Sequence, residues 1–256
     1  MNKEQILNYR IVGNGYPVVF LHGFLESNKM WENLLKHLPH IQAICIELPG
    51  HGKSKLLEQE LSLNNITEAV KLTILEITNE AFSIVGHSLG GYVALHLAED
   101  ISLSINEIVL QNSHPWPDGV TKKNDRHRTA RVVEYNKSLF LNEAIPRLYY
   151  KAEFYETKIN ELIDEANLMG EDAIIQSLYA MRDRSDKNHV LESWKEKIHI
   201  IQGEFDHLID AKKLEKQAKE NNNKFHLIKN IGHMAHHENE IEVARLLGFL
   251  WQNLRM

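Results

Sequence analysis

The chain of 256 residues is long enough for one large domain, or for one domain that carries an insertion. Its hydrophobic share of 43% and charged share of 25% are typical of globular proteins, and its net charge of −6 argues against a nucleic-acid partner. The stretch MNKEQILNYRIVGNG lacks the apolar segment of a signal peptide, and no apolar run reaches the ~18 residues of a membrane span, so no membrane partner is expected.

Apolar runs that predict strands alternate with amphipathic runs that predict helices. In chain order, the predicted strands span residues 6–12, 18–23, 42–48, 82–86, 105–113, 197–203 and 224–230, and the predicted helices span 27–39, 62–79, 89–100, 210–220 and 240–254. Gly13, Asn14 and Gly15 form a turn signal that predicts a hairpin of the first two strands. The third strand carries the single cysteine, Cys45, which excludes a disulfide framework and indicates a reducing, cytoplasmic setting.

The alternation is interrupted between Pro115 and about residue 190, where the sequence looks helical and has no convincing strand pattern. We therefore predict a core of residues 1–114 and 191–256 with a helical cap inserted over 115–190. A second independent domain is the alternative, which the shortness of the segment and the return of the strand pattern disfavour. Strands that are apolar throughout and alternate with helices predict an α/β fold with a mostly parallel sheet covered on both faces.

Ser88 lies where the strand over 82–86 ends and the next helix begins, within the stretch SIVGHSLGGYVALHLAED. Gly86 and Gly90 flank it in a Gly-x-Ser-x-Gly pattern, which permits a tight turn that presents the serine at the carboxyl edge of a parallel sheet. An ordinary helix N-cap is the alternative role. The strand before it, the helix after it and a further glycine, Gly91, favour a nucleophile.

A serine nucleophile needs a base, and position selects one among many histidines. His233 follows the last predicted strand, so it is expected at the same sheet edge as Ser88. His236 and His237 lie one helical turn further on and are expected to line the site or to face solvent. His96 lies within the helix that follows Ser88 and is expected to be packed.

An acid is needed to orient the imidazole of the base. Asp206 lies a few residues beyond the strand over 197–203, and we predict that it fills this role. Glu204 and Asp210 compete, but Glu204 is close to the strand and Asp210 begins the next helix. The chain order Ser88, Asp206, His233 is the order found in one particular α/β scaffold.

Two backbone N–H groups are needed to stabilise a developing oxyanion. One is predicted to be that of Leu89, directly after the serine. The stretch VVFLHGFLES offers the other, because His22 and Gly23 end a strand and Phe24 can present its N–H. A plain strand-ending turn is the alternative role for His22 and Gly23.

The motifs LHGF, ELPGHGKS, GHSLGG, GEFD and GHMAHHE occur in an order that resembles the α/β-hydrolase superfamily over nearly the whole chain. The resemblance implies an eight-stranded core sheet under a helical cap, although the short first strands point to seven. It also implies a nucleophile at Ser88, a base at His233, an orienting acid at Asp206, and backbone donors at Phe24 and Leu89. The HGF loop has one glycine and so differs from the triple-glycine esterases.

These features predict a serine hydrolase that cleaves small carboxylic esters and needs no metal or cofactor. The partner is expected to be a small molecule in a roofed pocket of ~300–1,000 Å³. The predicted substrate-binding residues are His22, His87, Trp116, Tyr150 and Met234. The sequence predicts no particular oligomeric state.

Three other functions remain open within this superfamily. LHGFLES and ELPGHGKS resemble the menaquinone-pathway lyase that makes a cyclohexadiene carboxylate, although that relative usually has tyrosine where this chain has His87. Its anionic substrate requires cations, which the inserted segment offers as Arg126, Arg128, Arg131 and Arg147. The remaining alternatives are a small-ligand sensor with an intact triad and a cofactor-free perhydrolase or haloperoxidase.

Overall fold

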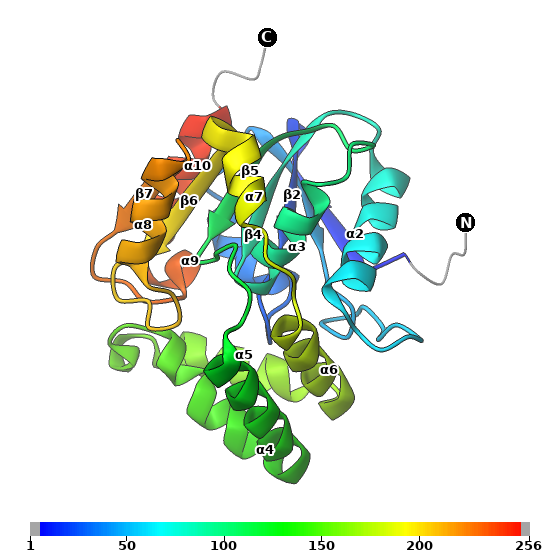
Figure 1. Ribbon diagram of the computed structural model, residues 1–256, viewed down its shortest axis with the longest axis vertical. Coiled ribbons are helices and arrows are strands. Elements are labelled where there is room, and N and C mark those ends of the chain that lie inside the picture. Colours follow the sequence, from blue (N-terminus) through cyan, green and yellow to red (C-terminus); the bar gives the residue numbers. More distant parts are fainter. Residues whose placement is uncertain (1–5, 252–256) are drawn as a thin grey trace.

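The computed structural model describes residues 6–251, which form a central sheet with helices on both faces (Figure 1). The strands are β1 (Tyr9–Val12), β2 (Tyr16–Leu21), β3 (Ile41–Ile46), β4 (Phe82–His87), β5 (Ile105–Gln111), β6 (Ile198–Gly203) and β7 (Lys224–Ile228). The α-helices are α1 (Glu32–Leu35), α2 (Leu63–Ile77), α3 (Leu89–Leu97), α4 (Val120–Ala144), α5 (Glu156–Asn167), α6 (Glu171–Arg182), α7 (Asn188–Trp194), α8 (Ala211–Glu220), α9 (Ala235–Glu238) and α10 (Glu240–Trp251). Short 3-10 helices are η2 (Asn28–Trp31), η3 (Pro146–Leu148), η4 (Ala152–Phe154) and η5 (Lys195–Lys197).

The sheet formed by the described residues has seven strands in the order β1-β3-β2-β4-β5-β6-β7. β1 runs antiparallel to β3, and every other neighbouring pair is parallel. The predicted α/β class with a mostly parallel sheet is therefore confirmed. The number of strands is seven rather than the eight that the resemblance implied.

The predicted hairpin of the first two strands is wrong. β1 pairs with β3, and β2 lies on the other side of β3 between β3 and β4. The turn passes close to the start of β3, because a Cβ on Gly15 would lie 1.9 Å from the carbonyl oxygen of His40. Burial explains why β2 lies inside the sheet and β1 at its edge. β2 is buried along almost its whole length and needs a neighbouring strand on each side, whereas β1 is largely exposed and suits an edge strand.

Alternate residues of each central strand face two separate cores. In β2, Val19 and Leu21 belong to the core that contains the buried residues of α2 and α3. Val18 and Phe20 point the other way and share a core with Trp31 and the buried residues of α10. The two covered faces fix the register of the strands, because a shift of one residue would exchange the two sets of side chains.

One predicted helix differs from the observed structure. The helix predicted over 27–39 is a 3-10 turn, η2, followed by the single turn of α1. Ser27 caps η2 by accepting a hydrogen bond from the Lys29 N–H. Trp31, at the end of η2, is fully buried, with its ring centroid 5.2 Å from that of Phe20 in β2. The closing helix begins as predicted, and its predicted end at residues 252–254 lies outside the described residues.

All residues from 115 to 190 are described, and none of them belongs to a strand. This segment connects β5 to β6 and contains α4, α5 and α6, which lie together beyond one end of the sheet (Figure 1). Its treatment as a separate cap domain remains a prediction. No helix within residues 6–251 combines the length and apolar character that crossing a bilayer requires.

Candidate active site

Ser88 occupies a strained turn between β4 and α3. Its backbone has φ 49° and ψ −110°, a conformation that is uncommon for residues other than glycine and is found mostly where function maintains it. The flanking glycines are required by space: a Cβ on Gly86 would lie 2.5 Å from the Gly90 carbonyl oxygen, and one on Gly90 would lie 2.2 Å from that of Leu21. Ser88 makes no side-chain capping hydrogen bond to α3, so the N-cap role is not what the structure shows.

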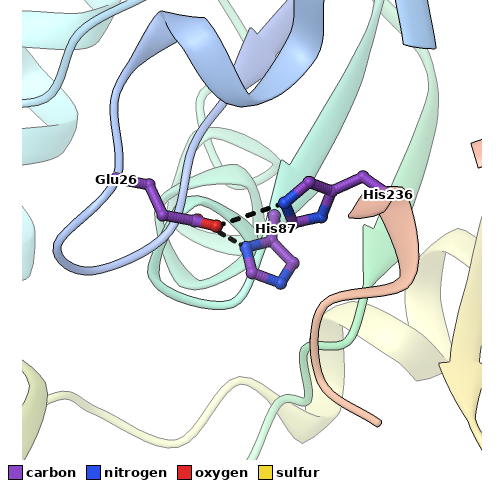
Figure 2. Close-up of side chains that lie close together, drawn as sticks. All are labelled: Glu26, His87 and His236. Carbon is purple, nitrogen blue, oxygen red and sulfur yellow. Dashed lines mark hydrogen bonds and ion pairs between the residues drawn. The ribbon is translucent and has the colours of Figure 1, made fainter. Parts of the chain in front are cut away.

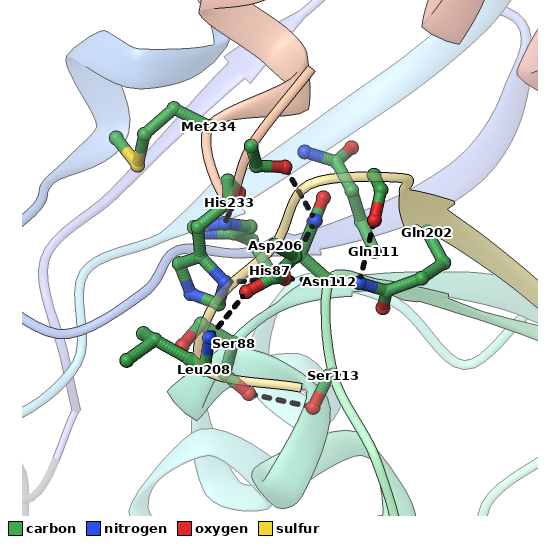
Figure 3. A network of polar contacts seen from close by, with 12 residues as sticks. His87, Ser88, Gln111, Asn112, Ser113, Gln202, Asp206, Leu208, His233 and Met234 are labelled. Atoms are coloured by element: carbon green, nitrogen blue, oxygen red, sulfur yellow. Dashed lines mark hydrogen bonds and ion pairs between the residues drawn. The ribbon is translucent and has the colours of Figure 1, made fainter. Parts of the chain in front are cut away.

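His233 and Asp206 form a buried hydrogen-bonded pair beside this turn (Figure 3). The His233 Nδ1 lies 2.8 Å from the Asp206 Oδ2. Because a carboxylate can only accept, the Nδ1 of a neutral His233 carries the proton and its Nε2 is left as the basic atom. The two competing acids are engaged elsewhere: Glu204 accepts from the Asn230 N–H, and Asp210 caps α8 through the Lys213 N–H.

The Asp206 carboxylate is held in its ionised form by several donors. Burial by itself would raise its pKa, but His233 and the hydrogen-bond donors around it lower that pKa below the usual value. Asn112 and Gln202 each donate a side-chain N–H to Oδ2 at 3.0 Å, and the Leu208 N–H donates to Oδ1 at 2.9 Å. The carboxylate is thereby fixed in position as well as in charge.

Phe24 and Leu89, the predicted oxyanion donors, flank Ser88 from two different elements. Leu89 is the first residue of α3, so its N–H has no acceptor within the helix. Phe24 follows Gly23 in the loop after β2 and lines the same cavity as Ser88. Gly23 cannot be replaced without movement, because a Cβ there would lie 2.3 Å from the Glu26 Oε2 and 2.6 Å from the His87 Nδ1.

A cavity of about 150 Å³ opens in front of Ser88 and His233. Its wall is mostly apolar and comes from the loop after β2, the turn at Ser88 between β4 and α3 (here called the elbow), the inserted helices and the loops after β6 and β7. The lining residues are Phe24, Leu25, Glu26, His87, Ser88, Tyr92, Lys122, Arg126, Phe140, Ala144, Leu148, Met181, Leu208, Ile209, His233 and Met234. The cavity is smaller than the ~300–1,000 Å³ expected from the sequence.

Two of the five predicted substrate-binding residues, His87 and Met234, line this cavity, and the other three do not. His22 is buried behind the loop, with its Nδ1 donating to the Gly23 carbonyl and its Nε2 accepting from the Leu48 N–H. Trp116 donates its Nε1–H to Gln217. Tyr150 stacks on Phe205 with the ring centroids 4.1 Å apart. The contacts of these three residues are with other parts of the protein, and their role in binding a substrate stays a prediction.

Two cations line the cavity from α4, namely Lys122 and Arg126. The Nε of Arg126 is paired at 2.5 Å with Asp118, whose other oxygen is paired with Arg184 at 2.8 Å. Burial, followed by the nearby Arg126, lowers the pKa of Lys122. Of the four arginines considered as anion-binding residues, only Arg126 lines the cavity. The side chains of Arg128 and Arg147 form exposed ion pairs within the inserted segment, and Arg131 is exposed.

Residues 16–240 match the family described as the alpha/beta hydrolase fold. The chain belongs to this family. It is 27% identical over 241 residues to the 2-succinyl-6-hydroxy-2,4-cyclohexadiene-1-carboxylate synthase of Enterobacter sp. (strain 638), and the alignment covers 91% of each protein.

Solved structures of other α/β hydrolases share this fold. A thermophilic esterase from Thermogutta terrifontis, with malate bound, matches with a TM-score of 0.86 at 22% identity, over 98% of this chain and 94% of that chain. MenH from S. aureus matches with a TM-score of 0.82 at 21% identity, over 95% of this chain and 97% of that chain. At such identities the likeness shows the common fold and leaves the reaction to be argued from the site.

This α/β hydrolase has a second buried cluster, formed by Glu26, His87 and His236 (Figure 2), which the sequence analysis did not predict. Their ligand-type atoms all lie within 4.8 Å of one another, close enough to be considered as a metal site. His236 was expected to line the site or face solvent, but it is 1% exposed and its ring centroid lies 4.8 Å from that of His87. The sequence analysis also did not predict Asn112 as a partner of Asp206. The available signal was a polar residue directly after strand β5.

Proposed function

We propose that this α/β hydrolase is a serine hydrolase that cleaves small carboxylic esters through an acyl-enzyme intermediate. The observation that carries the proposal is the strained Ser88 at the mouth of a small apolar cavity that His233, paired with Asp206, also lines. A residue held in a sparsely populated backbone conformation costs about 1–3 kcal/mol. Such a conformation persists where the surrounding structure maintains it for function.

The roles of the residues follow from their positions. His233 takes the Ser88 proton through its Nε2 as the serine oxygen attacks the ester carbonyl. The Phe24 and Leu89 N–H groups stabilise the resulting oxyanion. His233 then protonates the departing alcohol and activates water to release the acid, while Asp206 stabilises the imidazolium in both halves of the reaction.

The size and lining of the cavity support a short acyl group. Its volume of about 150 Å³ is below the ~300–1,000 Å³ of sites that enclose drug-sized ligands. Phe140, Ala144, Leu148 and Met181 supply apolar surface from the inserted segment. An acetyl or butyryl ester matches this volume better than a long acyl chain does.

Elimination from an anionic cyclohexadiene precursor is the second candidate. It is favoured by Lys122 and Arg126 in the cavity wall and by the 27% identity to the Enterobacter synthase. The small cavity and the histidine before Ser88 disfavour it. A small-ligand sensor would use the same cavity without turnover.

The test is a substrate panel that contains p-nitrophenyl esters of graded length, a thioester and the menaquinone-pathway intermediate. We expect kcat/KM to be highest for the acetate and butyrate esters and to fall beyond about eight carbons, with each fitting methylene contributing at most ~0.8 kcal/mol. Elimination from the intermediate without ester turnover would replace the hydrolase by the lyase. Tight binding of a small molecule with no turnover of any substrate would favour the sensor.

A further inference from the structure

The Glu26 carboxylate joins the oxyanion loop to the residue before the nucleophile. Its Oε2 accepts the Gly23 N–H at 2.6 Å and the His87 Nδ1–H at 2.7 Å. The other nitrogen of His87, Nε2, lies 3.0 Å from the backbone carbonyl oxygen of His233. Glu26 and His87 are both almost completely buried, with side chains 1% and 2% exposed. Three parts of the candidate site are thus connected through one carboxylate and one imidazole.

The two partners of His87 determine its protonation. A carboxylate and a backbone carbonyl are both acceptors, so each nitrogen of the ring must carry a hydrogen to satisfy them. The ring is then an imidazolium, and Glu26 is its counter-ion. Burial acts to lower the pKa of His87, but Glu26 and the His233 carbonyl outweigh it and raise that pKa.

The neighbouring histidines leave this charge balanced. Gln111 donates its Nε2–H to the His236 Nδ1 at 3.0 Å, so His236 carries its proton on Nε2, which faces the Glu26 Oε1 at 3.3 Å. Burial lowers the pKa of His236 to about 4, which keeps it neutral. The other titratable groups that act on these rings include Asp206, His22, His233 and His237, whose ring lies 4.3 Å from that of His236 and whose pKa burial lowers. The cluster itself holds one carboxylate and one cation.

Distances favour a proton over a divalent ion between Glu26 and His87. Two ligand atoms that each lie ~2.1 Å from a tetrahedral zinc are about 3.4 Å apart. The Glu26 Oε2 and the His87 Nδ1 are 2.7 Å apart, which is the length of a charge-assisted hydrogen bond. A metal would have to separate this pair.

We infer that His87 is a buried imidazolium, and that its ion pair with Glu26 is a positioning device that sets the oxyanion loop and the backbone of His233 relative to Ser88. This inference rests on the proposed function for its catalytic consequence, although the charge of His87 does not. Glu26 fixes the residue before the Phe24 donor, and His87 fixes the carbonyl of the base. Loss of the pair lets both shift, and a displacement of about 1 Å costs on the order of 100-fold in rate.

The charge is measured on the whole protein labelled with ¹⁵N-histidine, because protonated and unprotonated ring nitrogens resonate at different positions. We expect both His87 nitrogens to be protonated at pH 7, and His96 to serve as the neutral reference in the same spectrum. His96 is also buried, but its Nδ1 faces only the Tyr92 carbonyl, and burial lowers its pKa. An unprotonated nitrogen on His87 would overturn the inference, and a spectrum that changes on adding Zn²⁺ alone would replace it by a metal site.

The positioning role is tested by the rate at which a fluorophosphonate labels Ser88. Glu26→Gln removes the counter-ion at constant size, and it should neutralise His87 and slow labelling roughly 10–100-fold. Glu26→Asp keeps the charge and should restore the imidazolium and part of the rate. The control His96→Gln should stay within about threefold of wild type.

A folded Glu26→Gln variant labelled at the wild-type rate would refute the positioning role. Wild-type protein that reacts with no fluorophosphonate and turns over no ester would instead refute the proposed function. In that case the ¹⁵N spectra of wild type and Glu26→Gln still decide whether His87 is an imidazolium held by Glu26.

Discussion

At the scale of single residues, Asp206 has more partners than its role as a hydrogen-bond acceptor for His233 requires. Both of its oxygens accept hydrogen bonds, so replacement of one oxygen by an amide nitrogen changes the chemistry more than the packing. Asp206→Asn should keep substrate binding and lose roughly 10³–10⁴ in kcat, because the amide no longer enforces the correct imidazole tautomer. Steady-state kinetics on a short ester measures this loss.

Matched variants of the two neighbouring acids provide the control. Asn can cap α8 as Asp210 does, and Glu204 lies outside the His233 contact, so Asp210→Asn and Glu204→Gln should stay within about tenfold of wild type. A dead Asp210→Asn variant beside an active Asp206→Asn variant would require a different acid.

Residues that depend on local sequence were the ones that could be predicted. Ser88 is set by glycines two positions away on either side, and Asp206 and His233 each follow a strand end that the apolar pattern reveals. The Glu26, His87 and His236 cluster comes from three separate segments. No local pattern couples an acid in one loop to histidines elsewhere, so only the packed chain shows it.

At the scale of elements, α5 carries a carboxyl group in an unfavourable place. Glu165 is partly buried, and its Oε1 is without a hydrogen-bond partner among the described residues. Burial raises its pKa to about 7, although the nearby Lys29 opposes the shift. A carboxyl group whose pKa is higher in the folded state contributes stability below about pH 4.5, and this contribution is lost as the pH rises through 7.

Glu165→Gln should therefore raise the free energy of unfolding at pH 8 by about 1–2 kcal/mol, allowing for solvent screening, and leave it unchanged at pH 4. Urea unfolding at the two pH values measures the difference. Asp164→Asn, on the exposed side of the same helix, is the matched control. A Glu165→Gln variant that is less stable than wild type at pH 8 would contradict the account of this helix.

Elements were predicted well where burial and periodicity agree. The central strands β2 to β6 are apolar on both faces and were predicted close to their observed positions. The pairing of β1 was not predicted correctly. A turn signal indicates that the chain changes direction, but it does not indicate which strands become neighbours in the sheet. Only the exposure of β1 and the burial of β2, both properties of the assembled sheet, settle that choice.

At the scale of the whole molecule, the sheet, the elbow and the inserted helices act together. The loops after β2, β4, β6 and β7 all lie at the carboxyl ends of the parallel strands. α4 and α6 contribute to the wall of the cavity at this end of the sheet. The sequence predicted the mostly parallel sheet with helices around it. It overestimated the cavity, because the volume that remains between the inserted helices and the sheet depends on how side chains such as Phe140 and Met181 pack.

The central claim is that Ser88 is a nucleophile, and covalent labelling tests it most directly. Intact protein is treated with a fluorophosphonate, and mass spectrometry counts the adducts and locates the modified residue. We predict one adduct on Ser88 in the wild-type protein and none in Ser88→Ala, with both proteins equally folded. An adduct that persists in folded Ser88→Ala, or that maps to another residue in the wild type, would contradict the account.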